Sequence, residues 1–498
     1  MTSNSSGKEW AVMVYLATES SLAQENVFNL TEMKKIGVRE KLRAKANVIA
    51  WLETGPGPSE GIAYSLTGST SGDPEESLPP STRRYYKEGQ LSENIDHDLL
   101  KHRRECPNCR TQYLKGSTYA ERIVTFVKAV MDHYKANHYA LILSGHGQGW
   151  MGDFVMQGED GRSALTLPGL KATLEKILGR EGRKLDILGM DSCLMSMTEV
   201  CYEVQDHAKI LIGAEGFEPL AGWPYASVLE QIEGWEEGND DDENDERLKH
   251  LAKDIVEGYV TYYSDYADGG ISVDLSACDL GKQKELADAI LVLSKALRVG
   301  LIESKNSDFE RFKDHVILAH WECQQYRSGQ YVDLYDFCKC LGKRLPEVSK
   351  ECENVMKVIG DCQADKFILK SCYSGPLVQY SYGVSIYFPW AKPLNLEQYS
   401  DLAFCKETQW DEFLNVYLEK TQRVRRGYSN SERESLGAPR ARPIAEPTAL
   451  RRLNYATRNG SFNKDIESII GCMSNPATEY EECECLTRLR PQESKTPR

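Results

Sequence analysis

Two apolar runs of strand length constrain this chain more than any other feature. Tyr-Ala-Leu-Ile-Leu-Ser-Gly-His-Gly ends at Gly147, and Leu-Asp-Ile-Leu-Gly-Met-Asp-Ser-Cys ends at Cys193. Each run stops at a residue that can do chemistry, His146 in the first and Cys193 in the second. In an open parallel sheet, the C-terminal ends of the strands line the crevice where ligands bind. Two adjacent strands would therefore bring an imidazole and a thiol to the same edge.

Each of these residues alone has a plain structural explanation. A cysteine after a buried strand is often a small core residue, and a single histidine is often structural. Together, at two strand ends and beside small residues, they match the arrangement that a cysteine nucleophile and its base require. We therefore interpret His146 and Cys193 as a candidate catalytic pair.

Apolar strand patterns alternate with helical patterns along most of the chain, which predicts an α/β fold with a mainly parallel sheet covered by helices on both faces. We expect strands at 10–18, 46–54, 61–67, up to His146, and at 184–192, 208–214 and 270–275. We expect helices at 22–36, 118–136, 167–179, 195–206, 246–264 and 281–303.

The remaining sequence suggests a division into domains. We predict a catalytic domain at 1–305 with an inserted polar segment at 68–116. A smaller α+β region at 306–420 carries strands at 366–373 and 383–389. A flexible Arg/Pro-rich tail follows at 421–498, with a possible docking helix near Ile466, Ile469 and Ile470.

The chain resembles the clan CD cysteine peptidases, a group with a caspase-like fold, and within it the clostripain-like peptidases. The two catalytic runs resemble those of metacaspases, and the wider context is similar to clostripain-like enzymes over most of residues 10–420. The matching segments lie at 10–16, 29–37, 165–170, 193–200, 218–225, 331–337, 383–389 and 410–414. Their order along the chain is the family's order.

The resemblance implies an endopeptidase that cuts after Arg or Lys in exposed peptide segments. Asp191 matches the family's acid two residues before the nucleophile, where a carboxylate would pair with a substrate guanidinium. Its structural alternative is a strand-end cap. Ala221 stands where relatives often carry a second acid, so we expect Glu218, or else Glu215, to compensate.

The chemistry then assigns roles around the pair. The thiolate of Cys193 is the nucleophile, favoured by a helix that we predict to begin beside it. His146 delivers a proton to the leaving amine. The backbone N–H groups of Cys193 and Gly147 are the candidates for binding the oxyanion, as in clan CD relatives.

Composition argues against several other classes of protein. A net charge of −15 argues against general nucleic-acid binding, and no apolar run reaches the length of a membrane span. The first ten residues lack the apolar core of a signal peptide, and the fifteen cysteines are an odd number. We therefore expect a cytoplasmic protein with reduced thiols.

Two metal sites are open alternatives, and neither is required for the chemistry. His97, His102, Cys106 and Cys109 lie within thirteen residues and could hold a structural zinc ion, although the spacing is not that of a standard finger. The acidic run 236–246 could bind calcium, which some relatives require, but it lacks the register of an EF-hand. A solvated acidic loop is the alternative there.

Activation is a further expectation. Relatives are often processed between the two catalytic strands, where Arg162 is the basic residue of a Gly-rich stretch. We expect a latent enzyme switched on by cleavage at Arg162 or by a regulatory partner. The rival function is a catalytically silent scaffold of the same fold.

Overall fold

The structure is a computed structural model that describes residues 7–17, 22–52, 62–67, 118–151, 165–179, 183–265, 270–303, 307–360, 366–390 and 396–426. The predicted insertion at 68–116, which contains the four candidate zinc ligands, lies outside these ranges, as do Arg162 and the tail beyond residue 426. Predictions that concern those segments stay predictions.

Eight strands of the described residues form one sheet in the order β10-β7-β6-β5-β4-β1-β2-β3. The central pairs, from β2 through β1, β4 and β5 to β6, are all parallel, and β3, β7 and β10 add antiparallel edges. The strands are β1 (Lys8–Leu16), β2 (Ala46–Leu52), β3 (Ile62–Ser65), β4 (Ala136–Ser144), β5 (Leu185–Asp191), β6 (Ala208–Gly213), β7 (Val273–Asp279) and β10 (Ile368–Ser374). The predicted α/β fold with a mainly parallel sheet is confirmed.

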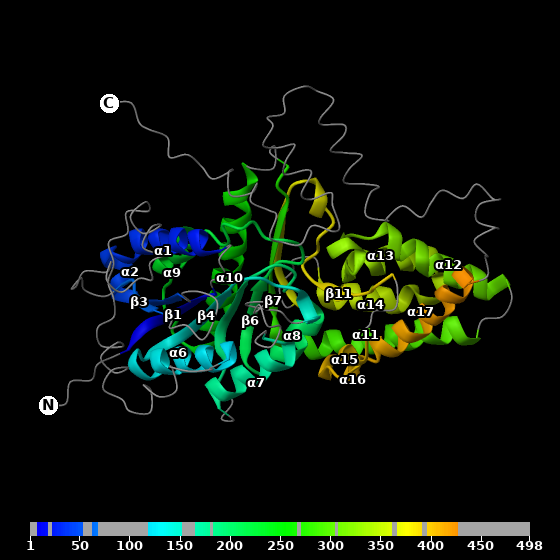
Figure 1. Cartoon of the computed structure of the whole chain (residues 1–498), viewed down its shortest axis with the longest axis horizontal. Coiled ribbons are helices and arrows are strands. Elements are labelled where there is room, and N and C mark those ends of the chain that lie inside the picture. Colours follow the sequence, from blue (N-terminus) through cyan, green and yellow to red (C-terminus); the bar gives the residue numbers. More distant parts are fainter. Residues whose placement is uncertain are drawn as a thin grey trace, which may run out of the picture.

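Helices cover both faces of this sheet, and the strand sequences show why (Figure 1). Along β1, Trp10, Val12 and Val14 enter one buried core while Met13 and Tyr15 enter the other, because successive side chains of a strand point to opposite faces. The first face carries α1 (Ala23–Gly37), α2 (Glu40–Lys45), α9 (Tyr225–Gly234) and α10 (Asp241–Ser264). The second carries α6 (Tyr119–His133), α7 (Leu167–Leu178), α8 (Thr198–Val204) and α11 (Gln283–Glu303).

The chain beyond residue 305 contributes a helical layer and a second, three-stranded sheet, ordered β11-β9-β8. Its strands are β8 (Gln325–Tyr326), β9 (Tyr331–Asp333) and β11 (Ser385–Tyr387). Its helices are α12 (Ser307–Glu322), α13 (Leu334–Arg344), α14 (Ser349–Ile359), α15 (Leu396–Ser400), α16 (Ala403–Thr408) and α17 (Trp410–Arg426). The predicted boundary at 305 stays a prediction, but β10 from this region pairs with β7 in the main sheet.

The helix predicted at 195–206 is shorter than expected, and this corrects the surroundings of Cys193. The helix α8 begins at Thr198, and Cys193 lies in a turn in which Leu194 has a positive φ of 64°. Residues 194 and 196 donate their backbone N–H groups to Gly216 and Ala214. These bonds hold the chain in an extended path, so the helix cannot begin beside the thiol.

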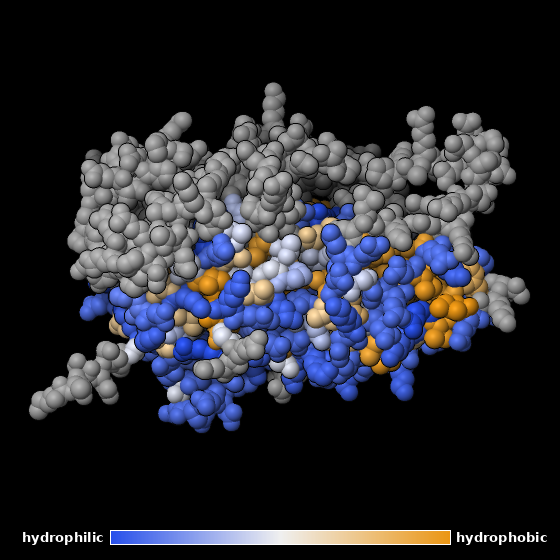
Figure 2. All heavy atoms as spheres, turned by 60° about the horizontal axis from the view of Figure 1, so that its bottom comes forward, coloured by the Kyte–Doolittle hydropathy of each residue, from blue (hydrophilic) through white to orange (hydrophobic). Residues whose placement is uncertain are grey.

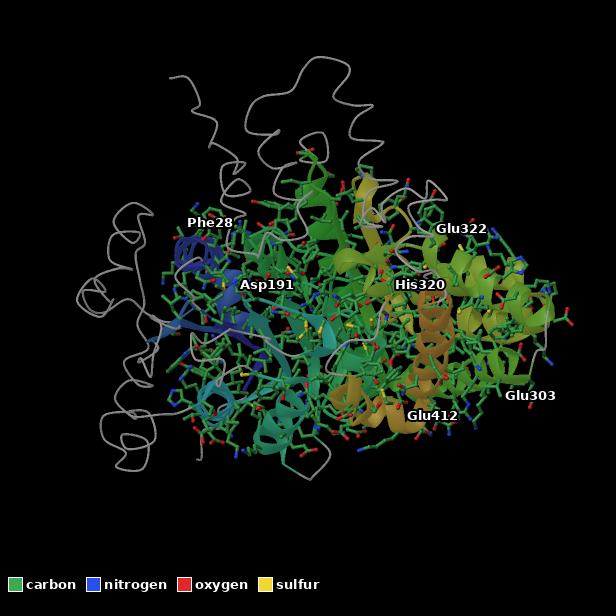
Figure 3. All side chains as sticks on the ribbon, turned by 45° about the vertical axis from the view of Figure 1, so that its right-hand side comes forward. Phe28, Asp191, Glu303, His320, Glu322 and Glu412 are labelled. Atoms are coloured by element: carbon green, nitrogen blue, oxygen red, sulfur yellow. The ribbon has the colours of Figure 1, made fainter. Side chains whose placement is uncertain are left out.

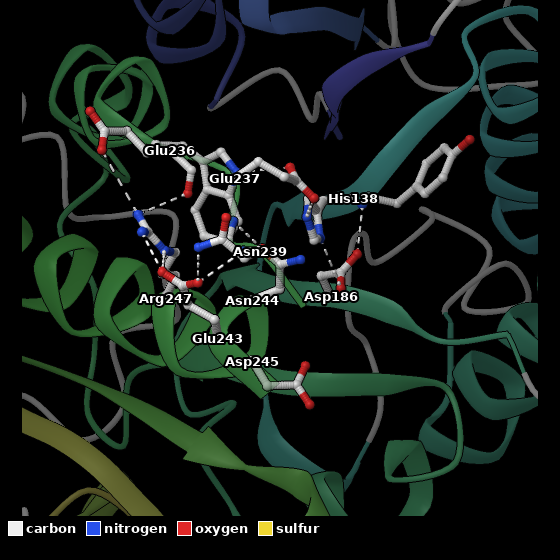
Figure 4. Close-up of polar contacts among 12 residues, drawn as sticks. His138, Asp186, Glu236, Glu237, Asn239, Glu243, Asn244, Asp245 and Arg247 are labelled. Atoms are coloured by element: carbon white, nitrogen blue, oxygen red, sulfur yellow. Dashed lines mark hydrogen bonds and ion pairs between the residues drawn. The ribbon is translucent and has the colours of Figure 1, made fainter. Parts of the chain in front are cut away.

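A buried polar network ties together the opposite, N-terminal ends of β4 and β5 (Figure 4). His138 contacts Asp186 at 3.4 Å and Glu237 at 3.1 Å, and its ring lies against Trp10 and Trp235. Burial alone would lower the pKa of His138, but the two carboxylates raise it overall. This network joins the N-terminal ends of the two strands. His146 and Cys193 follow the C-terminal ends, at the opposite edge of the sheet.

One patch of exposed hydrophobic surface lies at the end of the molecule that α11 and α12 form. Figure 2 shows a mostly hydrophilic face whose orange surface gathers at the end formed by the helical layer. Val292, Val299 and Ile302 on α11 are each about half exposed. Within the described part of the chain, no helix has the length and apolar content needed to cross a membrane.

The buried His320 on α12, labelled in Figure 3, makes the folding stability of the protein depend on pH. Its ring is fully buried and stacks on Phe388 at 3.9 Å and on Trp390 at 3.7 Å, and burial lowers its pKa to about 3. The unfolded chain therefore binds this proton below about pH 6.5 while the folded chain does not. Stability from this residue is complete above that pH and is lost as the pH falls toward 3.

We therefore expect His320→Gln to reduce the acid sensitivity of folding. The free energy of unfolding, measured in denaturant between pH 7.5 and 4.5, should fall less steeply in the variant, by up to about 1.4 kcal/mol per pH unit. Parallel curves for the two proteins would show that His320 is not the responsible group.

Candidate active site

The strand register brings the two predicted catalytic residues to one place. In the parallel pair of β4 and β5, Ser144 lies opposite Asp191. His146 and Cys193 each follow two residues later, so both leave the sheet at the same edge. The N–H of Gly145 donates to the carbonyl of Asp191 at 3.1 Å, which continues the strand pairing into the two loops.

Gly147 packs directly against the backbone of the cysteine turn. A Cβ atom at this position would lie 2.1 Å from the carbonyl oxygen of Cys193 and 3.0 Å from its nitrogen. Only a residue without a side chain permits this approach. The histidine loop and the cysteine turn are therefore in contact at Gly147, the residue directly after His146.

The thiol of Cys193 is buried and held by a backbone donor. Cys193 is 4% exposed, and the N–H of Glu218 donates to its Sγ at 3.2 Å. As a thiol, Sγ also faces the carbonyl of Glu218 at 3.8 Å. The backbone of Glu218, rather than the start of a helix, therefore contacts the thiol. The His146 side chain is half-buried.

The segment that carries Glu218 is fixed by a buried carboxylate. Asp274 on β7 accepts the N–H groups of Glu215 and Gly216 at 2.7 and 3.0 Å. Burial raises the pKa of Asp274 to about 6, although the two N–H donors oppose the increase. Asp274 had no assigned role in the sequence analysis, because nothing local marks it. Its partners lie almost sixty residues away.

Asp191 and Glu218 form a buried acidic pair behind the cysteine turn. Asp191 accepts hydrogen bonds from the Trp223 N–H at 3.0 Å and the Tyr225 hydroxyl at 2.7 Å, and Trp223 Nε1 donates to Glu218 Oε1 at 3.2 Å. Burial raises the pKa of Asp191, and burial together with the Asp191 charge raises that of Glu218 well above its usual range.

Gly222 is required for this arrangement. It has a positive φ of 67°, and an added Cβ would lie 2.8 Å from Asp191 Oδ1. The turn can therefore place the Trp223 N–H on Asp191 only with glycine before it. Trp223 and Tyr225 were visible as parts of a motif in the sequence, but their shared contact with Asp191 was not.

Glu215, the second candidate for a compensating acid, is committed elsewhere. Its carboxyl accepts the N–H of Gly383 at 2.8 Å. Burial, followed by the charges of Asp333 and Asp274, raises its pKa well above the usual range. This group supports the backbone behind the site.

The acidic run 236–246 makes capping contacts and ion pairs, and calcium binding there stays a prediction. Glu243 pairs with Arg247 (Figure 4). Asp240 caps α10 by accepting the N–H of Glu243 at 2.8 Å, and Asp245 pairs with Lys209. Among the described residues, no group of three or more His, Cys, Asp or Glu side chains could hold a metal ion. The zinc ligands His97, His102, Cys106 and Cys109 lie outside those residues.

The contact between the two loops generates a prediction. Gly147→Ala should separate the histidine loop from the cysteine turn, because its methyl group would overlap the Cys193 carbonyl. We expect a lower melting temperature and slower reaction of Cys193 with iodoacetamide. Gly234→Ala is the matched control, since an added Cβ there meets nothing within 4 Å. Equal behaviour of the two variants would contradict the described contact.

The chain is similar to known proteins along most of its length. A model of the clostripain family matches residues 96–417. Clostripain from Hathewaya histolytica is 22% identical over 507 residues, which cover 86% of this chain and 90% of that protein.

Two solved structures share the fold. A secreted C11 cysteine protease from Bacteroides thetaiotaomicron, in complex with an irreversible peptide inhibitor, has a TM-score of 0.54 at 16% identity. An inactive zymogen C11 protease from Parabacteroides distasonis has a TM-score of 0.54 at 17% identity. Each comparison covers 81% of this chain and 99% of the other. Since the family model matches well over half of the sequence, the chain belongs to the clostripain family and is a cysteine endopeptidase.

Proposed function

We propose that this peptidase hydrolyses peptide bonds after Arg or Lys through a dyad of Cys193 and His146. The observation that carries the proposal is the meeting of the two strand ends. Ser144 lies opposite Asp191, and Gly147 lies against the carbonyl of Cys193. No other pair of a thiol and an imidazole is needed to explain the family's chemistry.

The reaction follows from these groups. The Cys193 thiolate attacks the carbonyl carbon of the substrate, and the electron pair moves to the carbonyl oxygen. His146 then protonates the amine as the C–N bond breaks, which leaves an acyl-enzyme. In the second half, His146 takes a proton from water, the resulting hydroxide attacks the acyl carbon, and the thiolate leaves.

The proposed oxyanion site is formed by the backbone N–H groups of Cys193 and Gly147. The backbones of the two residues are in contact, because a Cβ on Gly147 would lie 3.0 Å from the nitrogen of Cys193. Donors fixed in a packed backbone need no reorganisation when the oxyanion forms.

Two observations support basic specificity despite the alanine at 221. Asp191 lies beside the cysteine turn, and Glu218 contacts the same Trp223. Glu218 Oε2 is buried and has no hydrogen-bond partner among the described residues. A guanidinium or ammonium group would satisfy this oxygen and favour ionisation of both acids. Glu215 Oε1 also has no hydrogen-bond partner among the described residues, but its other oxygen accepts the Gly383 N–H. Glu218 shares Trp223 with Asp191 and contacts Cys193 through its backbone, and it is therefore our candidate for the second acid, ahead of Glu215.

The dyad predicts a large loss of activity in single variants. Cys193→Ala and His146→Ala should each lower kcat for a fluorogenic Arg peptide by roughly 1,000-fold or more, and the double variant should be no worse, since residues of one unit are not additive. Cys372→Ala, which removes another thiol on β10, is the control. Substantial cleavage by folded Cys193→Ala protein would refute the dyad.

The acidic pair predicts a change in specificity. Asp191→Asn should lower the ratio of kcat/KM for Arg over neutral P1 peptides by about 10-fold to 100-fold, because a charge-assisted hydrogen bond contributes about 1.5–3 kcal/mol. Glu218→Gln should act in the same direction. Asp186→Asn, at the other end of β5, should leave the ratio unchanged. An unaltered ratio in both pocket variants would place the specificity elsewhere.

We also propose that the enzyme is made in a latent form and activated by cleavage at Arg162 or by a partner. Arg162→Ala should keep the protein single-chain by intact-mass measurement and delay the appearance of activity. Fully active enzyme that remains uncut at Arg162 would shift the control to another segment. Cytoplasmic location and the zinc site at 97–109 remain predictions.

A further inference from the structure

We propose that the three-stranded sheet of β8, β9 and β11 is a positioning element that holds both catalytic loops in register, with Arg327 as its key residue. The two loops are the histidine loop, residues 145–149, and the nucleophile loop, residues 192–197. The proposal rests on the proposed function, because it concerns the alignment of His146 with Cys193.

The strand β11 is joined to the nucleophile loop. Ser385 donates its backbone N–H and its hydroxyl to the carbonyl of Ser196, at 3.0 and 3.2 Å, and it forms a parallel bridge with Met197. The hydroxyl of Ser196 in turn donates to the carbonyl of Gly383 at 2.7 Å. These groups are buried, so water does not compete for the bonds.

At its other end, the small sheet contacts the histidine loop through Tyr331 and through Arg327, which lies in the turn between β8 and β9. Arg327 donates from Nη1 to the backbone carbonyl of Gln148 at 2.9 Å and from Nη2 to its Oε1 at 2.6 Å. The Tyr331 hydroxyl donates to the same carbonyl at 2.6 Å. Gln148 lies two residues after His146 and one after Gly147. Both lone pairs of its carbonyl are therefore taken by groups of the small sheet.

The backbone on both sides of this contact is specialised. Arg327 has a positive φ of 45°, which is uncommon for a residue with a side chain and costs of order 1–2 kcal/mol. Such a conformation persists where the surroundings fix it, and it is often found at functional positions. On the facing loop, Gly149 has a φ of 66°, and an added Cβ would lie 2.5 Å from Met197 Sδ and 3.1 Å from the Tyr331 ring.

One body thus holds both loops. Tyr331 on β9 lies opposite Tyr387 on β11 in the antiparallel ladder, so Tyr331, which donates to Gln148, and Ser385, which donates to Ser196, belong to one hydrogen-bonded sheet. Arg327 lies in the short turn that joins β8 to β9. Tyr331 is fully buried. The small sheet thus adds an attachment point for each loop beyond those that β4, β5 and the chain at Ala214 and Gly216 provide.

The test compares variants that remove different parts of this contact. Arg327→Met removes the two bonds to Gln148 and the bond from Nη1 to the Tyr331 hydroxyl. Tyr331→Phe removes that hydroxyl and keeps the ring, and Gln148→Ala removes only the side-chain contact at Oε1. Arg327→Lys can restore one contact but not the paired geometry. Arg344→Met is the matched control, because Arg344 lies in the same region and pairs with Glu322 on the surface.

With an Arg peptide as substrate, we expect Arg327→Met to lower kcat by about 10-fold to 100-fold with KM changed less than about 3-fold, since a misplaced catalytic group slows chemistry rather than binding. Arg327→Lys should be intermediate, Tyr331→Phe milder, and Arg344→Met equal to wild type. Arg327→Met and Gln148→Ala should be non-additive, because they break the same contact.

A second readout does not depend on turnover. The rate of Cys193 alkylation by iodoacetamide, followed by mass spectrometry from pH 5 to 9, reports the pairing of thiolate with imidazolium. Arg327→Met should lose the reactivity below pH 7 that wild type shows, while its melting temperature and near-UV spectrum show that it is folded. If Arg327→Met does not fold, Tyr331→Phe and Gln148→Ala carry the same test.

Two results would count against different parts of the argument. Wild-type kcat and an unchanged alkylation profile in folded Arg327→Met, Tyr331→Phe and Gln148→Ala would overturn the positioning role of the small sheet while leaving the dyad intact. If the alkylation rate of wild-type Cys193 instead follows the pH profile of an ordinary thiol, and Cys193→Ala still cleaves, the dyad itself is wrong. The small sheet then has no catalytic pair to position.

Discussion

The parallel pairing of β4 with β5 is the constraint on which the rest of the site depends. It sets Ser144 opposite Asp191, and a single residue in each loop, Gly145 or Ser192, then separates the strand end from His146 or Cys193. The absence of a side chain at Gly147 lets the two loops touch. A shift of this register by a single residue would turn each side chain to the other face of its strand, so the core and the site are specified by the same bonds.

Buried carboxyl groups surround this edge of the sheet, and most of them act on the backbone. Asp274 holds the segment that donates an N–H to Cys193, and Glu215 and Asp333 hold the backbone of Gly383 and Tyr382. Burial raises the pKa of Asp274 to about 6 and of Asp333 to about 7. Glu218 differs from these in lying next to Asp191, whose charge helps to raise its pKa, and in donating its backbone N–H to the Cys193 thiol.

Much of the main sheet could be predicted from the sequence, because strand and helix periodicities are local signals. The strands β4 and β5 lie within a residue or two of their expected positions. The expected start of the helix beside Cys193 was wrong, since hydrogen bonds from residues 194 and 196 to Gly216 and Ala214 oppose a helix there. Most helices beyond residue 305 were not assigned, because their apolar faces are completed only by packing against one another and α11.

The sequence by itself determined the order of strands and helices, the two reactive residues at strand ends and the glycine between them. Only the tertiary structure decided what surrounds the thiol. The Glu218 N–H, the Asp274 anchor and the Arg327 contact with Gln148 join residues 25, 58 or more, and 179 positions apart. Periodicity reports which face of an element is buried, but contacts over such separations depend on how the elements pack, and no local pattern encodes them.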